Sequence, residues 1–334
     1  MLKVGVIGIG TVAKVHINAI KDSEYAELVA ICDINNAKME QLYVPSKYTD
    51  IDEMLKSEKL DVVHICLPHY LHVPVVKKIA KSGINVFEEK PAGINLAEVK
   101  ELFDLESIYG IKFGVCFQNR LNNTSIQLKE IIKSNRYGNV LGTKGIVTWK
   151  RKMNYFNEAS WRGTINEAGG GVMLNQSIHT IDLLNYLVDD ISAVFAKTAN
   201  LTLPDVEIED SVMASMDYKN IKNANAIFFA TIGYCEDSSV NIEVVCQKAK
   251  FKIEDNTLYK IESGNKEIVC QNILNNDVKQ YYGSAHQMAI EGFYKAIINN
   301  TQDYINIKEA VKSIAIIDVI NKFSIENKKV TVLE

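Results

Sequence analysis

The chain has 334 residues, of which 47% are hydrophobic and 23% charged, and its formal net charge is −4 at pH 7. This is the composition of an ordinary globular protein that is long enough for two domains. No stripe of basic residues occurs, so nucleic acid is not an expected partner. The longest apolar runs fall well short of the roughly 20 residues of a membrane-spanning helix, so we expect no membrane segment.

The six cysteines are spread along the chain, and their spacing fits neither a Cys-x-x-Cys pair nor a zinc site. Several of them end apolar runs and are interpreted as buried small side chains. The N-terminus starts directly with a predicted strand, so we expect no signal peptide. We therefore expect a cytoplasmic protein with reduced thiols and no metal site.

Residues 1 to about 119 alternate short apolar runs with helical patterns such as 74–81 and 96–109. This alternation predicts βαβ units and a parallel sheet with helices on both faces. The predicted strands are Val4–Ile7, Leu28–Cys32, Val62–Leu67, Ile84–Phe87 and Lys112–Cys116.

The pattern changes after residue 119, where strand-like stretches are joined by short polar turns and helices come only before and after them. A helix is predicted from about Asn122 to Ser134, and two more over 284–298 and 307–323. The predicted strands are Gly142–Trp149, Ile191–Asn200, Ser211–Tyr218, Asn223–Thr231, Val240–Cys246 and Lys250–Ile253. We predict two domains, an α/β domain over 1–119 and an α+β domain with a large, mostly antiparallel sheet over 120–334.

The first predicted strand runs into a Gly-x-Gly-x-x-Ala turn and then a helix, the pattern of a dinucleotide-binding turn. The glycines permit a tight turn and close approach of a pyrophosphate to the helix N-terminus. Asp33 ends the second strand, where a carboxylate binds ribose hydroxyls and repels a 2′-phosphate. The pattern therefore predicts NAD rather than NADP. The cofactor-binding residues expected here are Gly8, Gly10, Thr11, Val12, Ala13 and Asp33.

The loop that follows the next strand of the predicted sheet is expected to line the cofactor crevice. Leu67, Pro68 and His72 are the candidates in this loop. The alternative for His72 is that it caps or packs the following helix.

The tripeptide Glu89-Lys90-Pro91 directly follows the apolar run Ile84–Phe87, which places Lys90 at the carboxyl end of a predicted parallel strand. Ligands bind at this end of such sheets. Burial there lowers the pKa of a lysine, and the proline keeps Lys90 out of the helical region. Lys90 is therefore a catalytic candidate. The alternative is a solvated lysine in a loop.

A second polar segment begins with three glycines, 169–171, and continues with a helical pattern. Asn175, His179 and Asp182 are spaced i, i+4, i+7, which predicts that they share one helix face. A neutral imidazole is a suitable base for a hydroxyl proton, so His179 is a catalytic candidate. The alternative is a core histidine whose hydrogen bonds are satisfied.

Several polar and aromatic residues near this segment suit a carbohydrate. Arg120 offers a rigid fork of donors for hydroxyls or a carboxylate. Tyr155, Trp161 and Arg162 lie shortly before the glycine run and are expected to contact substrate. The alternative for Trp161 is a packing anchor in a loop.

Taken in order, these motifs resemble the Gfo/Idh/MocA family of oxidoreductases across nearly the whole chain. The motifs are Gly8-x-Gly10-x-x-Ala13, Asp33, Pro68-x-x-Leu71-His72, Glu89-Lys90-Pro91 and the glycine run followed by His179-x-x-Asp182. The resemblance implies a Rossmann domain, then a domain with a large open sheet through which homodimers or homotetramers form. It also implies that Lys90 contacts the reacting hydroxyl and that His179 serves as acid and base.

Many members of that family carry Asp four residues before the histidine, whereas this chain carries Asn175. An amide cannot stabilise an imidazolium as a carboxylate does. We therefore assign Asn175 to positioning the substrate. Glu89, Lys90 and Gln118 are also expected to contact the cofactor.

The sequence predicts an NAD-dependent enzyme that transfers a hydride between nicotinamide and a secondary hydroxyl of a sugar, polyol or sugar derivative. Two alternatives remain open at this point. One is a redox-neutral enzyme that cleaves glycosides with tightly bound NAD. The other is a non-catalytic sensor of NAD and sugar.

Overall fold

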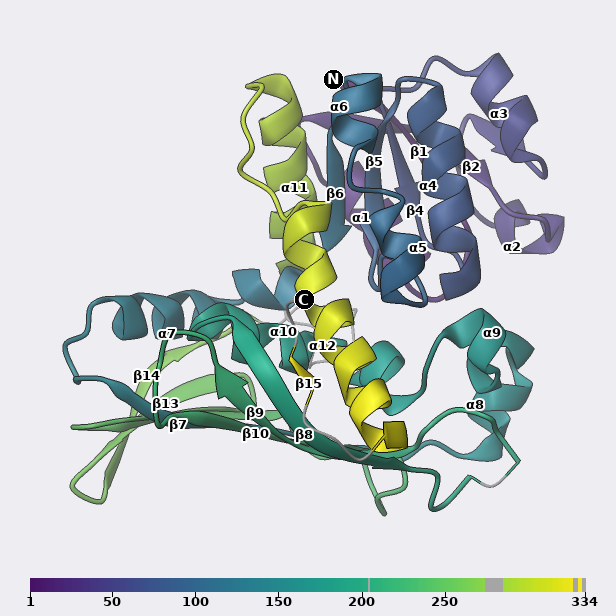
Figure 1. Cartoon of the computed structure of the whole chain (residues 1–334). Coiled ribbons are helices and arrows are strands. Elements are labelled where there is room, and N and C mark those ends of the chain that lie inside the picture. Colours follow the sequence, from purple (N-terminus) through teal and green to yellow (C-terminus); the bar gives the residue numbers. More distant parts are fainter. Residues whose placement is uncertain (204, 274–284, 327–329, 332–334) are drawn as a thin grey trace. The chain divides into compact units, whose positions relative to one another are not determined.

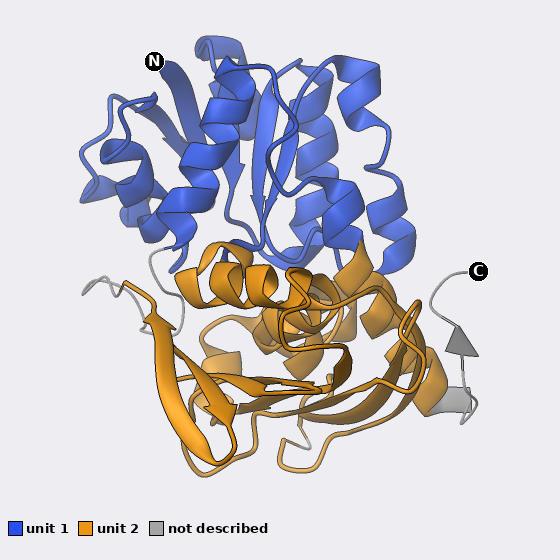
Figure 2. Cartoon of the chain, turned by 90° about the vertical axis from the view of Figure 1, so that its left-hand side faces the viewer, with its two compact units in different colours: residues 1–118, 285–311 blue, residues 119–284, 312–334 orange. Residues whose placement is uncertain are grey.

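The computed structural model describes residues 1–203, 205–273, 285–326 and 330–331. The chain forms two compact units (Figure 2), and each is described by itself. Unit 1 comprises Met1–Gln118 and Ala285–Val311, and unit 2 comprises Asn119–Ser284 and Lys312–Glu334. Residues 285–311 therefore belong to unit 1, whereas a single division at residue 119 places them in the second domain.

Unit 1 is built on six strands that pair in parallel throughout, in the order β3-β2-β1-β4-β5-β6. This is the strand order of the Rossmann fold, so the predicted doubly wound sheet is confirmed. The short β3 was not predicted, because Ser-Lys-Tyr contains no apolar run and none of its residues is buried. The strands are β1 Leu2–Ile7, β2 Ala26–Cys32, β3 Ser46–Tyr48, β4 Val62–Ile65, β5 Asn85–Glu89 and β6 Phe113–Cys116.

Helices lie on both faces of this sheet (Figure 1). The helical pattern over 96–109 was predicted as one segment but forms two short helices. Helix α11 packs against α1 and β6, and Gln287 donates a hydrogen bond of 3.2 Å to the carbonyl of Ala19 in α1. The helices are α1 Ala13–Lys21, α2 Asn36–Glu40, α3 Ile51–Ser57, α4 His72–Lys81, α5 Leu96–Lys100, α6 Leu105–Tyr109 and α11 Ala285–Ile298. The predicted start of α11, at residue 284, lies outside the described residues.

Unit 2 is built on nine strands in the order β14-β13-β12-β11-β7-β10-β9-β8-β15. Neighbouring strands are antiparallel except β7 and β10, which are parallel, so the predicted mostly antiparallel sheet is confirmed. The strands are β7 Val140–Thr148, β8 Ile191–Ala199, β9 Ser211–Tyr218, β10 Asn225–Thr231, β11 Asn241–Cys246, β12 Lys250–Glu254, β13 Thr257–Glu262, β14 Asn265–Gln271 and β15 Val330–Thr331.

Helices of unit 2 cover one face of this sheet, and side chains alternate accordingly along β10, where Phe228 is buried and its neighbours Ile227 and Phe229 are exposed. Gly145 lets α10 approach β7, because a Cβ there would lie 2.7 Å from Thr180 Cγ2. The helices are α7 Asn123–Lys133, α8 Met153–Asn157, α9 Ile165–Ala168, α10 Ile178–Leu187 and α12 Ile307–Glu326, which begins in unit 1. Within the described residues, none of the helices is long and apolar enough to cross a membrane.

Candidate active site

The turn between β1 and α1 has the geometry of a dinucleotide cradle. Gly8 has φ +86°, and a Cβ there would lie 2.5 Å from the carbonyl oxygen of Cys66. A Cβ on Gly10 would instead point into open space, and no side chain caps the start of α1. Ala13 is fully buried, whereas Thr11 is exposed and Val12 half-buried. The open backbone at a helix N-terminus fits a pyrophosphate.

Asp33 lies at the end of β2 and holds the same turn in place. Its Oδ2 accepts a hydrogen bond of 2.7 Å from the amide of Ile9, and its Oδ1 accepts one of 2.8 Å from the amide of Asn35. A carboxylate has about four acceptor sites, so capacity remains for ribose hydroxyls. The structure thus gives Asp33 an additional role in ordering the glycine turn that the sequence did not indicate.

The loop after β4 is tied to the segment after β5 by His72. Its Nδ1 lies 2.7 Å from the carbonyl of Pro91, and its Nε2 lies 2.8 Å from the carbonyl of Leu67. Burial lowers the pKa of His72 against the opposite effect of these two carbonyls. The ring is 1% exposed, so its observed role is to join two loops from within, while Leu67 and Pro68 are half-exposed.

Two adjacent buried glutamates on β5 differ in their surroundings. Burial raises the pKa of Glu88 well above its usual range, and His72 Nδ1 lies 3.5 Å from Glu88 Oε1. Burial also acts to raise the pKa of Glu89, but His16 and His286 outweigh it and hold that pKa well below the usual range. His16 Nε2 lies 2.9 Å from Glu89 Oε1, and His286 Nε2 lies 3.5 Å from the same oxygen.

Lys90 follows β5 directly, at the carboxyl end of the parallel sheet, and its peptide bond to Pro91 is cis. The side chain is half-buried. Burial lowers the pKa of Lys90, and the charge of Glu89 acts in the opposite direction. The residue therefore occupies the position and the kind of environment that the sequence predicted for a catalytic lysine.

Gln118 follows β6, the strand next to β5, and is fully buried. Cys116 Sγ lies 3.7 Å from Gln118 Oε1. Among the described residues, the side-chain Nε2 of Gln118 has no hydrogen-bond partner. An unsatisfied amide at the carboxyl end of the sheet suits a ligand, as a cofactor-contacting residue requires.

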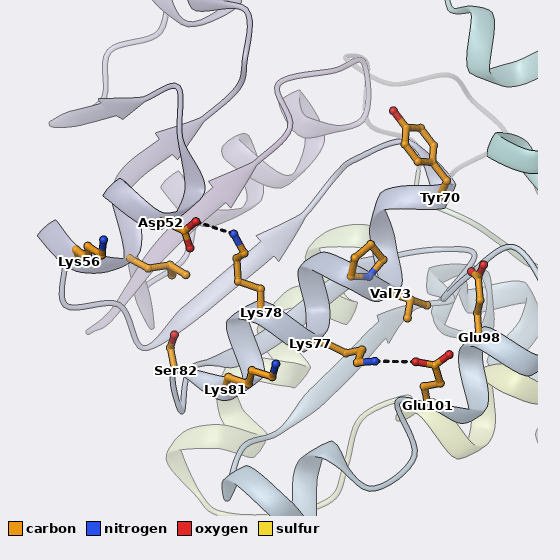
Figure 3. A pocket seen from close by; sticks show the side chains of 12 residues that line it. Asp52, Lys56, Tyr70, Val73, Lys77, Lys78, Lys81, Ser82, Glu98 and Glu101 are labelled. Atoms are coloured by element: carbon orange, nitrogen blue, oxygen red, sulfur yellow. Dashed lines mark hydrogen bonds and ion pairs between the residues drawn. The ribbon is translucent and has the colours of Figure 1, made fainter.

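A separate surface pocket of about 820 Å³ lies on unit 1 (Figure 3). Two of its ion pairs, Lys78–Asp52 at 2.8 Å and Lys77–Glu101 at 2.7 Å, link neighbouring helices. Its lining contains none of the predicted site residues. The candidate site therefore rests on the strand ends and not on this pocket.

In unit 2, the segment that carries His179 departs from the predicted regular helix. Val172–Gln176 form a π-helical turn, and α10 begins only after Ser177. Both the amide and the hydroxyl of Ser177 donate to the carbonyl of Val172, at 2.8 and 2.7 Å. The expectation of one regular helix was therefore wrong at Asn175, which lies in the π-turn, while His179 and Asp182 both lie on α10. Such π-turns are frequent at functional sites.

Glu209 holds the start of this turn, a role that the sequence did not indicate. Its two carboxylate oxygens accept hydrogen bonds from the amides of Gly171 and Met173, at 2.8 and 3.0 Å. Gly171 is required here, because a Cβ would lie 1.9 Å from the carbonyl oxygen of Glu209. Burial raises the pKa of Glu209, although the two amides act to lower it. The contact spans a long sequence separation, so no local pattern could reveal it.

Four predicted substrate residues come together in unit 2. Asn175 Nδ2 lies 3.1 Å from Tyr155 Oη, and Arg162 Nη1 donates a hydrogen bond of 2.9 Å to the carbonyl of Tyr155. The guanidinium of Arg162 stacks 4.3 Å from the centre of the Tyr155 ring and lies 5.9 Å from that of Trp161. All four side chains are half-buried, which leaves part of each open to a ligand.

Arg120 and Asp182 form a buried bidentate ion pair within unit 2. Arg120 Nε and Nη2 lie 2.8 and 2.7 Å from the two carboxylate oxygens, and the Ser313 hydroxyl donates to Asp182 at 3.0 Å. Arg120 is 4% exposed and Asp182 is 1% exposed. Asp182 thus binds Arg120, and this pair anchors α10, the helix on which the buried His179 lies.

Comparison with protein families accounts for most of the chain. Residues 2–117 match the model described as "Oxidoreductase family, NAD-binding Rossmann fold", and residues 125–252 match the Gfo/Idh/MocA C-terminal domain. The chain belongs to the Gfo/Idh/MocA family. Unit 1 therefore carries the NAD-binding Rossmann domain of this oxidoreductase family, as the glycine turn and Asp33 predicted.

Curated relatives in this family include sugar and inositol dehydrogenases. Glucose-6-phosphate 3-dehydrogenase of Bacillus subtilis is 27% identical over 307 residues, which cover 87% of each chain. Inositol 2-dehydrogenase of Rhizobium meliloti is 22% identical and covers 99% of each chain. Among solved structures, levoglucosan dehydrogenase in complex with NADH and levoglucosan has a TM-score of 0.89 at 20% identity over 100% of both chains. This likeness shows that the chain has the same fold as that structure over its whole length.

Proposed function

We propose that this protein is an NAD-dependent dehydrogenase that oxidises a secondary hydroxyl of a sugar, a polyol or a derivative of one. The observation that carries the proposal is Lys90, a half-buried lysine of lowered pKa at the carboxyl end of β5 in an NAD-binding Rossmann sheet. The named activities of the sugar and inositol dehydrogenases to which the chain is similar support the substrate class.

In the proposed reaction, Lys90 binds the reacting hydroxyl oxygen. An ammonium group there stabilises the alkoxide character that develops as the C–H bond is broken, and it does so most strongly where water is excluded. The imidazole of His179 takes the hydroxyl proton in oxidation and returns it in reduction. Bound NAD supplies the nicotinamide that accepts the hydride.

The remaining candidates have binding and positioning roles in this proposal. Asn175, Tyr155, Trp161 and Arg162 present amide, phenol, indole and guanidinium groups to substrate hydroxyls. Arg120 acts through Asp182 by fixing α10. The residues that would hold NAD are Gly8, Gly10, Thr11, Val12, Ala13, Asp33, Leu67, Pro68, Glu89, Lys90 and Gln118, with His72 supporting two of their loops.

The proposal is tested by following NADH absorbance with inositols, aldoses, sugar phosphates, glycosides and sugar nucleotides, in both directions. At least one substrate should be turned over by the wild type and not by Lys90→Met. Cofactor that copurifies in stoichiometric amount, with glycoside cleavage and no NADH release, would overturn the dehydrogenase and support the redox-neutral enzyme. NAD-dependent binding of sugar without turnover would point to a sensor.

We also propose that unit 2 forms a homo-oligomer through the uncovered face of its sheet. Met213 of β9 and Phe229 of β10 pair across the strands and are exposed, as are the nearby Ile227 and Phe195. An exposed apolar patch on a sheet suits a subunit interface. Sedimentation should show a dimer or larger in the wild type and a smaller species in Met213→Asp.

We propose a cytoplasmic location on the basis of the cysteines. All six are free, and five of them are buried or half-buried, as expected in a reducing compartment. Cell fractionation tests this directly, and recovery of the protein outside the cytoplasm would contradict it.

A further inference from the structure

Five buried side chains from four elements of unit 1 form a continuous polar chain that includes Glu89, the residue before Lys90. Tyr294 Oη lies 2.8 Å from His64 Nε2, and His64 Nδ1 lies 2.8 Å from His16 Nδ1. His16 Nε2 lies 2.9 Å from Glu89 Oε1, and His286 Nε2 approaches the same oxygen to 3.5 Å. None of the five is more than 6% exposed.

The protons of this chain can be assigned from its contacts. The contact between the Nδ1 atoms of His16 and His64 needs one proton between two nitrogens, and either ring can supply it. Burial lowers the pKa of His64 well below its usual range, and burial raises the pKa of Tyr294, so both stay neutral. If His64 supplies that proton, a neutral His16 accepts it at Nδ1 and donates its Nε2–H to Glu89; if His16 supplies it, His16 donates to Glu89 only as an imidazolium.

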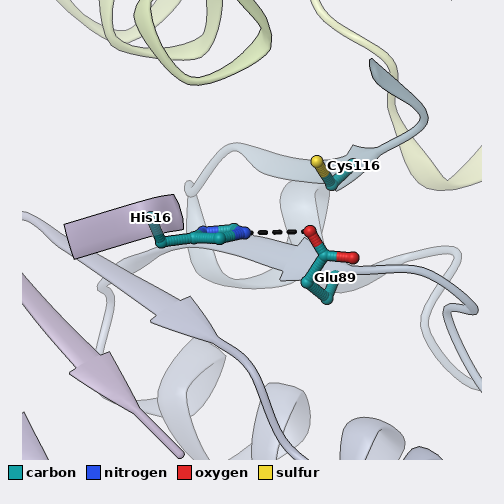
Figure 4. A group of neighbouring side chains, drawn as sticks. All are labelled: His16, Glu89 and Cys116. Carbon is teal, nitrogen blue, oxygen red and sulfur yellow. Dashed lines mark hydrogen bonds and ion pairs between the residues drawn. The ribbon is translucent and has the colours of Figure 1, made fainter. Parts of the chain in front are cut away.

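His16 and His286 are the main hydrogen-bond donors to Glu89. Burial raises the pKa of Cys66 and of Cys116, so both stay thiols, and Figure 4 shows Cys116 on the strand beside Glu89. Carboxylates in such places ionise only where donors compensate for the lost water. Apart from His16 and His286, the titratable groups that interact with Glu89 are Cys66, Cys116, His64, His72, Glu88 and Lys90.

We propose that the two histidines that flank Glu89 keep it ionised so that Lys90 retains its proton. His64 and Tyr294 fix the ring of His16 for this task. The inference rests on the proposed catalytic role of Lys90, because the retained ammonium is the form that stabilises an alkoxide. We assign positioning roles to His16, His286, His64 and Tyr294, which act on Lys90 through Glu89.

The same place in the fold also gathers atom types that bind metals. One ring nitrogen of His16, one carboxylate oxygen of Glu89 and Cys116 Sγ lie within 4.8 Å of one another (Figure 4). Both nitrogens of His16 already have partners at hydrogen-bond distance, so the geometry favours protons between these atoms. The experiment is therefore run in parallel with a chelator and with added zinc.

The direct test measures the proton affinity of Lys90 in the full chain without cofactor. The rate at which acetic anhydride modifies Lys90, followed by mass spectrometry across pH, gives the midpoint of its titration. The variants are Glu89→Gln, His16→Leu, His16→Gln and Tyr294→Phe. Lys112→Met is the matched control, because Lys112 is a buried lysine of unit 1 whose ammonium bonds the carbonyl of Thr301.

We expect the midpoint in Glu89→Gln to fall by about one pH unit or more, because a nearby opposite charge is lost. His16→Leu should shift the midpoint in the same direction, and His16→Gln should shift it less because it restores an N–H donor. Tyr294→Phe should give the smallest fall, and Lys112→Met should give none. The basic limb of the pH profile of kcat/KM should move with the midpoint.

An unchanged midpoint in Glu89→Gln and in His16→Leu overturns the inference. If His16→Leu does not fold, Tyr294→Phe decides, since it removes a single oxygen, and an unchanged midpoint there overturns the proposed chain. Shifts that occur only after zinc is added, and vanish with chelator, also overturn it. The acetylation needs no substrate, so a dehydrogenase that retains its rate in Lys90→Met would refute the proposed function separately.

Discussion

The two groups of candidate residues are built in different ways. In unit 1 they lie at the carboxyl ends of adjacent parallel strands, so short motifs in the sequence mark the places directly. In unit 2 they lie around a π-turn whose start is held by Glu209 and whose Asn175 contacts Tyr155, while Arg120 pairs with Asp182 on the helix that follows the turn. The difference shows that motif residues can be recognised from the sequence, whereas the residues that hold them in place are identified only from the fold.

The largest expected effect tests the unit 1 group. Lys90→Met should lower kcat by about 10³-fold or more, because the ammonium that stabilises the developing alkoxide is lost. NAD affinity, measured by calorimetry, should stay within a few-fold. Lys112→Met is the control and should lower stability while leaving kcat near the wild-type value. Nearly full turnover by Lys90→Met would mean that this lysine has no catalytic role.

The next effect concerns the scaffold of unit 2. Arg120→Met should cost about 3–5 kcal/mol in the free energy of unfolding, because it leaves the Asp182 carboxylate buried without its partner. Urea denaturation measures the loss. The double variant Arg120→Met with Asp182→Leu should recover part of it, since no buried charge remains. If the stability losses of the two single variants simply add in the double variant, the ion pair does not hold α10.

A third prediction contrasts the two glutamates of β5 by their pH dependence. The pKa of Glu89 is depressed, so its contribution is present above the unfolded value of about 4.3 and is lost as the pH falls through the folded value. Glu89→Gln should therefore lose about 1–3 kcal/mol at pH 8 and less at pH 4.

The pKa of Glu88 is raised, so its contribution is present below about pH 4.3 and is lost as the pH rises through the folded value. Glu88→Gln should therefore gain stability relative to the wild type at pH 8 and not at pH 4. Denaturant unfolding at both pH values compares the two variants. Equal responses would contradict the assignment of opposite charge states to these neighbours.

The smallest expected effect concerns the departure from the family pattern in unit 2. Asn175→Asp places a carboxylate four residues before His179, which stabilises an imidazolium. The acidic limb of kcat against pH should move to higher pH, with a change in maximal kcat of less than about tenfold. Gln176→Glu adds the same charge one residue later and should move the limb less. An unchanged profile in Asn175→Asp would separate position 175 from the proton transfer.

Much of unit 1 could be predicted from the sequence, because apolar runs and a glycine turn are local signals. The parallel sheet, the glycine turn and the place of Lys90 after a strand follow from them. The short β3 carries no apolar run, and the inward role of His72 depends on carbonyls of two separate loops. Neither feature has a local pattern.

In unit 2, the sequence indicated the large sheet and grouped Asn175, Tyr155, Trp161 and Arg162 as neighbours of a ligand. It did not indicate the π-turn, because periodicity alone cannot distinguish a wide turn from a regular one. It also assigned Arg120 to substrate, whereas two of its donors bind Asp182. Long-range ion pairs of this kind cannot be read from spacing.

The central proposal is that Lys90 and His179 both act in the oxidation of the substrate hydroxyl by NAD. Single-turnover formation of NADH, with one substrate from the screen, tests it in the wild type, Lys90→Met, His179→Asn and the double variant. The account predicts that each single variant slows the step by at least about 10²-fold and that the double variant is little slower than the worse single one. A wild-type rate in either single variant would contradict it.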